Sequence, residues 1–155
     1  MPNGGLEGLE LAADVLADLR ARLPLVAERT VAAVVAEVAE YADPLRGELG
    51  SNIARAVEMA LGTFLRVAES SAAIQPEGPI RGALDGAYAL GRGEARTGRT
   101  MDALLAAYRV GARVSWREWG GAAVEAGLPS ATVVQFAELV FAYIDQLSAA
   151  SVAGH

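Results

Sequence analysis

Cysteine, lysine and histidine are absent or nearly absent from this chain of 155 residues. There is no cysteine, which excludes a disulfide framework, a thiolate metal site and a thiol nucleophile. All 13 basic residues are arginine, so neither a lysine Schiff base nor a P-loop lysine is available. The single histidine is the last residue, His155, which excludes a Ser-His-Asp triad or a histidine-built metal site in the body of the fold.

Positive charge is also scarce. The formal net charge is −6 and the isoelectric point is about 4.8, which argues against binding to a nucleic-acid backbone. The first ten residues have no basic segment of a signal peptide. Apolar runs such as Val31–Val38 fall far short of the roughly 20 residues that cross a bilayer. We therefore expect a soluble cytoplasmic protein forming a single domain over residues 1–155, with residues 1–8 disordered.

The apolar residues recur with a helical period almost everywhere, and no stretch alternates as a strand does. The pattern predicts an all-α domain of about six helices. Pro24 should separate the first two, and the second should end before Asp43-Pro44. The later helices are expected at about 46–69, 80–96, 101–126 and from Ser130 onward, with a loop over 70–79 and Thr100 as an N-cap.

The helix over 80–96 contains four glycines, Gly82, Gly86, Gly91 and Gly93. Each interior glycine costs a helix about 1 kcal/mol relative to alanine. The pattern therefore indicates either a short or broken helix or a neighbouring helix that approaches closely.

Arginines and aromatic residues between 88 and 117 are the candidates for ligand binding. Arginines could hold an anion by forked hydrogen bonds, and aromatic rings could line a cavity between helices. The candidate binding residues are Tyr88, Arg92, Tyr108, Arg109, Arg113 and Trp116. The plainer interpretation is that the arginines form a solvated flank paired with nearby carboxylates and that the aromatics are core. Arg109 is the exception, because its helical position predicts a part-buried, paired and structural side chain.

Carboxylate pairs such as Asp14/Asp18 do not predict a metal enzyme, because a diiron bundle needs histidines that the body of the chain lacks. The segment Gly91-Arg92-Gly93 fits neither a dinucleotide fingerprint nor a P-loop. We expect no catalytic residue, no metal and no cofactor; haem in particular lacks its usual axial ligands.

The last two helices have apolar residues off their main core stripe, at Val110, Val114, Leu139 and Ala142. A helix that is apolar all round is buried on all sides. One interpretation is that this second face pairs with a second copy of the chain to give a homodimer with a four-helix interface. The alternative is that earlier helices of the same chain cover it.

Several segments carry a resemblance to a known family. They are Gly91–Gly98, Leu104–Arg113 with its Ala-Tyr-Arg-x-Gly-Ala-Arg core, Trp116, Ala137–Asp145, Tyr41–Pro44 and Ser51-Asn52. The chain resembles the RsbRD-type N-terminal domain (RsbT co-antagonist family) at the front of many actinobacterial PucR-like transcriptional regulators. The resemblance implies an all-α, globin-like sensory or regulatory domain without haem. It also implies that an attached or partner helix-turn-helix domain binds DNA, and it supplies no catalytic residue.

The leading hypothesis is therefore a non-catalytic regulatory domain that mediates oligomerisation and signal transfer. The first alternative is a small-molecule or anion sensor with a pocket near Tyr88, Tyr108, Arg109 and Trp116. A small all-α enzyme is the third. The sequence leaves open the ligand, the regulated genes, and whether the chain is an excised domain or a stand-alone protein.

Overall fold

Regular structure in the described part of the chain is helical throughout. The computed structural model describes residues 13–42, 47–69 and 80–155, with side chains of the second range described from residue 54. The elements are α1 (Ala13–Glu37), η1 (Ala39–Tyr41, a 3-10 turn), α2 (Gly47–Glu69), α3 (Ile80–Arg96), α4 (Met101–Glu125) and α5 (Ser130–Gly154). The all-α prediction is confirmed. The predicted disorder of 1–8 and the loop over 70–79 lie outside the described residues.

The prediction of six helices is wrong, because Pro24 lies inside α1 and does not end a helix. A proline within a helix removes one backbone hydrogen bond and crowds the preceding turn. Pro24 is exposed, while Leu19 before it and Val26 after it are both fully buried. Burial of apolar side chains on both sides of the proline outweighs the local defect, so the two predicted helices are one.

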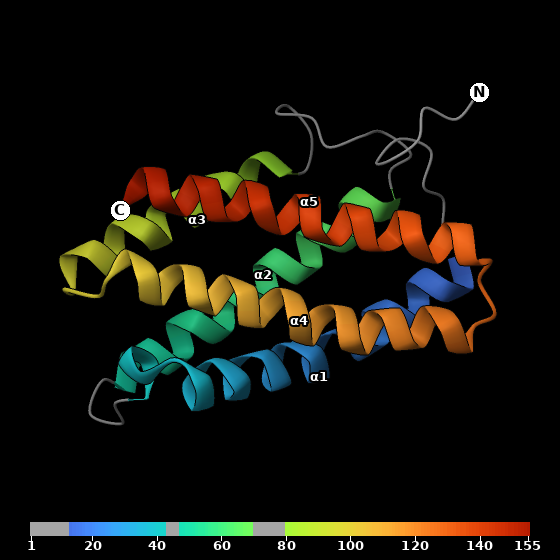
Figure 1. Ribbon diagram of the computed structural model, residues 1–155, viewed down its shortest axis with the longest axis horizontal. Helices are drawn as coiled ribbons and strands as arrows, with labels where there is room; N and C mark the ends of the chain where they lie inside the picture. The colour runs from blue at the N-terminus through green and yellow to red at the C-terminus, as the bar shows by residue number, and fades with distance from the viewer. Residues whose placement is uncertain (1–12, 43–46, 70–79) are drawn as a thin grey trace.

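The helices form a bundle in which α5, α4 and α1 run roughly side by side and α2 crosses obliquely behind them (Figure 1). The most extensive contacts join α3 to α5, α1 to α4 and α1 to α2. An aromatic cluster fills the centre, where Phe64 of α2 stacks on Trp119 of α4 and contacts Phe136 and Tyr143 of α5. These contacts hold α2 against the α4–α5 pair.

Two glycines allow α3 and α5 to pack backbone against backbone. A Cβ at Gly91 would lie 1.9 Å from the carbonyl oxygen of Ser151, and one at Gly154 would lie 2.1 Å from that of Tyr88. Neither position can hold a side chain without moving the helices apart. The close-approach interpretation of the glycine-rich helix is therefore confirmed at Gly91, and α3 is continuous.

Helix α4 is buried on two sides because α1 covers one face and α5 another. Val110 lies in a small core cluster with Val34 and Val38 of α1, and Leu139 lies in the main core. The prediction that Val110 and Leu139 face a second copy is therefore wrong, since their own chain covers them. Val114 and Ala142 are half-buried.

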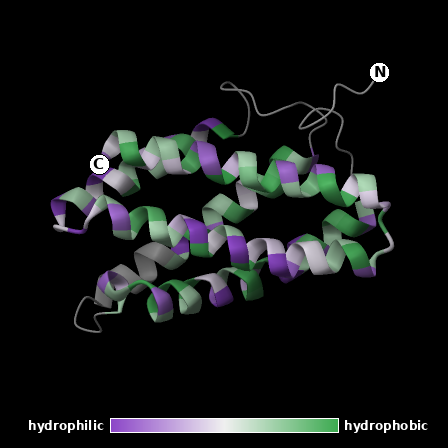
Figure 2. Ribbon diagram, in the orientation of Figure 1, coloured by the Kyte–Doolittle hydropathy of each residue, from purple (hydrophilic) through white to green (hydrophobic). Residues whose placement is uncertain are grey.

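Within the described residues, α5 is the one helix long and apolar enough to cross a membrane by length and composition. It carries few hydrophilic positions (Figure 2). Phe136, Tyr143 and Leu147 are nonetheless buried against other helices of the same chain. One face of α5 therefore belongs to the core of the bundle.

Candidate functional site

The candidate site is a cavity of about 1010 Å³ between α2, α3 and α4, with additional residues from α1, η1 and α5. Its lining is mainly apolar, and includes Ala56, Met59, Leu90, Leu104 and Ile144. Cavities of this size and character receive small molecules in many proteins. Polar side chains interrupt this lining at a few positions: Tyr41, Arg55, Glu94, Thr97, Arg99, Tyr108 and Ser115.

The wall contributed by α3 is made of very small residues. Gly82, Gly86 and Gly93 line the cavity, and a Cβ built on any of them would meet no atom within 4 Å. Their spacing of four and seven places them on one face of the helix. These glycines therefore leave open volume in the cavity, whereas Gly91 serves the packing against α5.

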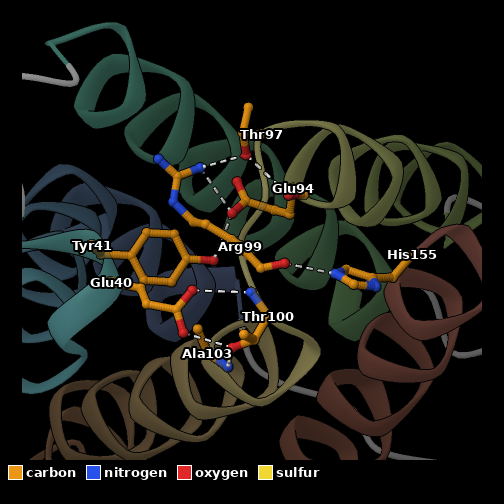
Figure 3. A network of polar contacts seen from close by, with 8 residues as sticks. All are labelled: Glu40, Tyr41, Glu94, Thr97, Arg99, Thr100, Ala103 and His155. Carbon is orange, nitrogen blue, oxygen red and sulfur yellow. Dashed lines mark hydrogen bonds and ion pairs between the residues drawn. The ribbon is translucent and has the colours of Figure 1, made fainter.

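A buried polar network, drawn in Figure 3, contributes Tyr41, Glu94, Thr97 and Arg99 to the polar part of the cavity lining. Arg99 Nη1 donates to Glu94 Oε2 at 3.0 Å and lies 3.1 Å from Thr97 Oγ1. The Tyr41 hydroxyl donates to the same Glu94 oxygen at 3.1 Å, and the Arg99 guanidinium lies 5.2 Å above the Tyr41 ring. Arg99 and Glu94 are each only 4% exposed. The network therefore holds a nearly fully desolvated ion pair.

The turn between α3 and α4 ties this network to the ends of two other helices. Gly98, with a φ of +82°, lets the chain reverse just before Arg99. Thr100 caps α4, as predicted, by accepting a hydrogen bond from the Ala103 N–H. The Glu40 carboxylate accepts bonds from the Thr100 N–H and hydroxyl, and the His155 Nε2 lies 2.9 Å from the Arg99 carbonyl oxygen. The end of α5 thus contacts the residue whose side chain lines the cavity.

Burial keeps the two tyrosines of the cavity lining, Tyr41 and Tyr108, and the core residue Tyr143 in the neutral form. Burial, reinforced by the adjacent Glu94 carboxylate, raises the pKa of Tyr41 well above its ordinary value. Burial likewise raises the pKa of Tyr108 and of Tyr143. The site offers neutral tyrosine hydroxyls and an ion pair whose two charges offset each other.

Of the six predicted binding residues, the structure places only Tyr108 in the cavity wall. Its hydroxyl lies 2.6 Å from Ser151 Oγ, which donates to the Ala87 carbonyl oxygen at 2.7 Å. Tyr88 and Arg92 are exposed on another face of α3. The predicted grouping of these residues is therefore wrong.

The remaining predicted residues belong to α4 but do not line the cavity. Arg109 is exposed and forms no ion pair with the described part of the chain, so the prediction of a part-buried, paired arginine is wrong. Arg113 is exposed and pairs with Glu37 of α1, which fits the solvated-flank interpretation. Trp116 packs against Phe136 and Phe141.

Sequence reasoning missed the polar end of the cavity, formed by Tyr41, Glu94, Thr97 and Arg99. Tyr41 comes from a turn more than 50 residues before the others, and no local pattern indicates that pairing. The glycine face did carry a signal, since Gly82, Gly86 and Gly93 share one helical face distinct from that of Gly91. Within the described residues no group of three or more histidine, aspartate or glutamate side chains could hold a metal ion.

Comparison with known proteins identifies the family. Residues 9–155 match the model of the PucR-like N-terminal domain. The chain belongs to this family. No curated protein and no solved structure gives a significant match. The PucR-like part of the predicted resemblance is thereby confirmed, while the RsbRD type, the globin-like packing and the actinobacterial source stay predictions.

Proposed function

We propose that this PucR-like domain is the non-catalytic sensory domain of a cytoplasmic PucR-type transcriptional regulator, and that it binds a small molecule in the cavity between α2, α3 and α4. The observation that carries the proposal is the glycine face of α3, which leaves a cavity of about 1010 Å³ open within a folded bundle. Each glycine lowers helix stability by about 1 kcal/mol relative to alanine, so filling the cavity would have been the more stable arrangement. DNA binding belongs to an attached or partner helix-turn-helix domain.

The polar network supplies a route from the cavity to the end of α5. The side chain of Arg99 lines the cavity and its carbonyl oxygen contacts His155. A ligand that shifts Arg99 would also shift the turn that holds the last residues of α5. Signal transfer therefore runs, in this proposal, through the α3–α4 turn to the C-terminal end of the domain.

The cavity is tested with a pair of glycine variants. Gly86→Leu projects a side chain into the cavity, while Gly121→Leu places the same side chain at an open, exposed position of α4 that does not line it. Both should fold and gain helix stability, by about 0.5–1 kcal/mol. A metabolite screen by thermal shift should find compounds that raise the melting midpoint of the wild type and Gly121→Leu but not of Gly86→Leu. Compounds that stabilise all three alike would bind elsewhere and refute the cavity as the sensor site.

Signal transfer is tested by amide hydrogen exchange in the last turn of α5, with Gly86→Leu serving as a mimic of a ligand bound against α3. Exchange at residues 150–155 should change in Gly86→Leu and stay at the wild-type rate in Gly121→Leu. Equal rates in both variants would separate the cavity from the end of α5 and refute the route through Arg99.

Oligomerisation is the second candidate function, and the exposed apolar surface of α5 favours it. Val134 and Phe141 lie seven residues apart on one face of α5 and are 56% and 44% exposed. Phe141 also contacts the half-buried Trp116 of α4. This stripe replaces Val110 and Leu139 as the proposed homodimer contact of α4 and α5. Val134→Glu with Phe141→Glu should turn a dimer into a folded monomer by light scattering, and Leu25→Glu on α1 is the control. A wild type that stays monomeric at every concentration would refute this candidate.

A further inference from the structure

The charged residues that face the cavity are two arginines and one glutamate: Arg55 of α2, Arg99 and Glu94. Glu94 is engaged, because its Oε2 accepts hydrogen bonds from both Arg99 and Tyr41. Arg55 is exposed at the cavity and forms no ion pair with any described residue. The charged lining therefore has one positive charge more than negative, in a chain whose net charge is −6.

The buried guanidinium of Arg99 also has hydrogen-bonding capacity that the protein leaves unused. Its Nη1 is shared between Glu94 and Thr97, while its Nε is buried without an acceptor among the described residues. A buried donor without a partner is costly, and such groups are rare in folded proteins. Figure 3 shows that the guanidinium stands at the edge of the network, away from His155 and Thr100. The guanidinium therefore has a buried donor, Nε, to which the described residues offer no acceptor.

We propose that the ligand of this cavity is an amphipathic anion, an apolar molecule carrying one carboxylate or similar acidic group. The inference rests on the proposed function, since it specifies the molecule that the cavity binds. The acidic group binds to the exposed guanidinium of Arg55, because forked hydrogen bonds from a guanidinium fit a carboxylate. The apolar part lies along Gly82, Gly86 and the apolar residues of α2 and α4.

The chemistry of the lining separates this ligand from its competitors. A cationic ligand would meet Arg55 without a free carboxylate to offset it, because Glu94 already neutralises Arg99. An uncharged apolar ligand would fill the glycine-walled part and leave Arg55 unpaired. Only an amphipathic anion satisfies both the apolar wall and the excess positive charge.

Two fluorescent probes with the same apolar frame test the inference. One is 1-anilinonaphthalene-8-sulfonate, and the other is N-phenyl-1-naphthylamine, which lacks the sulfonate. Both probes should bind the wild type at one site per chain. Gly86→Leu should abolish the binding of both probes, and Gly121→Leu should abolish the binding of neither. Arg55→Gln should raise the dissociation constant of the sulfonate probe by about three- to ten-fold. The dissociation constant of the uncharged probe should stay within about two-fold of the wild-type value. Arg92→Gln, which removes an exposed arginine of α3 outside the cavity, is the matched control and should change neither.

The outcomes distinguish the inference from the proposed function. If both probes depend on Gly86 but Arg55→Gln changes neither, the cavity binds ligands without preferring anions, and the inference alone is overturned. An equal loss of affinity for both probes in Arg55→Gln would mean that this arginine has a structural role. That result would also overturn the inference. If neither probe binds, or Gly86→Leu leaves both unchanged, the cavity is not a ligand site and the proposed function fails together with the inference.

Discussion

Arg99 and Glu94 form an ion pair of 3.0 Å inside the domain, with side chains only 3% and 5% exposed. They are five positions apart in sequence, and the turn at Gly98 folds the arginine back over the last turn of α3. Removing two charges from water is expensive, and the remaining bonds to Tyr41 and Thr97 offset part of that cost. The pair fixes the polar end of the cavity in one geometry.

Loss of one partner should destabilise the domain strongly. Glu94→Gln leaves Arg99 as a buried, uncompensated charge, and we expect the free energy of unfolding to fall by about 3–5 kcal/mol. Arg99→Met should have a similar effect, and the double variant should lose less than the sum of the two. Urea denaturation followed by circular dichroism measures all three. Arg81→Met, which removes an exposed arginine paired with Asp85, should change stability by less than about 1 kcal/mol.

Two glycines of α3 should respond in opposite directions to the same substitution. Gly91→Ala places a methyl group against the Ser151 carbonyl oxygen, and we expect a loss of about 2–3 kcal/mol because α3 and α5 must separate. Gly86→Ala meets open space and should gain about 0.5–1 kcal/mol from helix propensity. Thermal or urea unfolding of both variants decides the matter. A neutral Gly91→Ala would mean that the two helices can separate without loss.

Stability should fall steeply above about pH 10, the ordinary pKa of tyrosine. Burial raises the pKa of Tyr41, Tyr108 and Tyr143, so the unfolded chain releases these protons at lower pH than the folded domain does. Their contribution is fully present below the unfolded pKa and is lost as pH rises above it, at up to about 1.4 kcal/mol per pH unit for each tyrosine. The chain has no lysine or cysteine to titrate in the same window. Urea midpoints at pH 8 to 11 should show the decline, and Tyr41→Phe should make it shallower.

Arg109 and Arg113 should prove replaceable. Arg109 is exposed without an ion pair in the described chain, and the Arg113–Glu37 pair lies at the surface. Alanine at position 109 should change the free energy of unfolding by less than about 0.5 kcal/mol, as is usual for surface substitutions. A clear loss of stability in Arg109→Ala, measured by thermal unfolding, would return this residue to a structural role.

The sequence by itself determined those features of the helices that depend on local interactions. The helical period fixed the all-α class, and Ile80–Arg96 begins and ends where the pattern predicts. Thr100 was recognisable as an N-cap because a hydroxyl before a helix meets the free backbone N–H groups of its first turn. These features depend on interactions between residues close together in sequence, so they can be predicted from the sequence.

Only the tertiary structure decided what long-range burial controls. Pro24 stays inside α1 because apolar residues on both sides of it are buried by other helices, a free-energy gain that no local propensity reveals. Val110 is covered by α1 and Arg109 faces solvent, although both are neighbours on α4. The cavity and its polar end exist because Tyr41 and Glu94, 53 residues apart, meet across the bundle. Such contacts are set by how whole helices pack, and the free energy of that packing depends on every surface that they bury together.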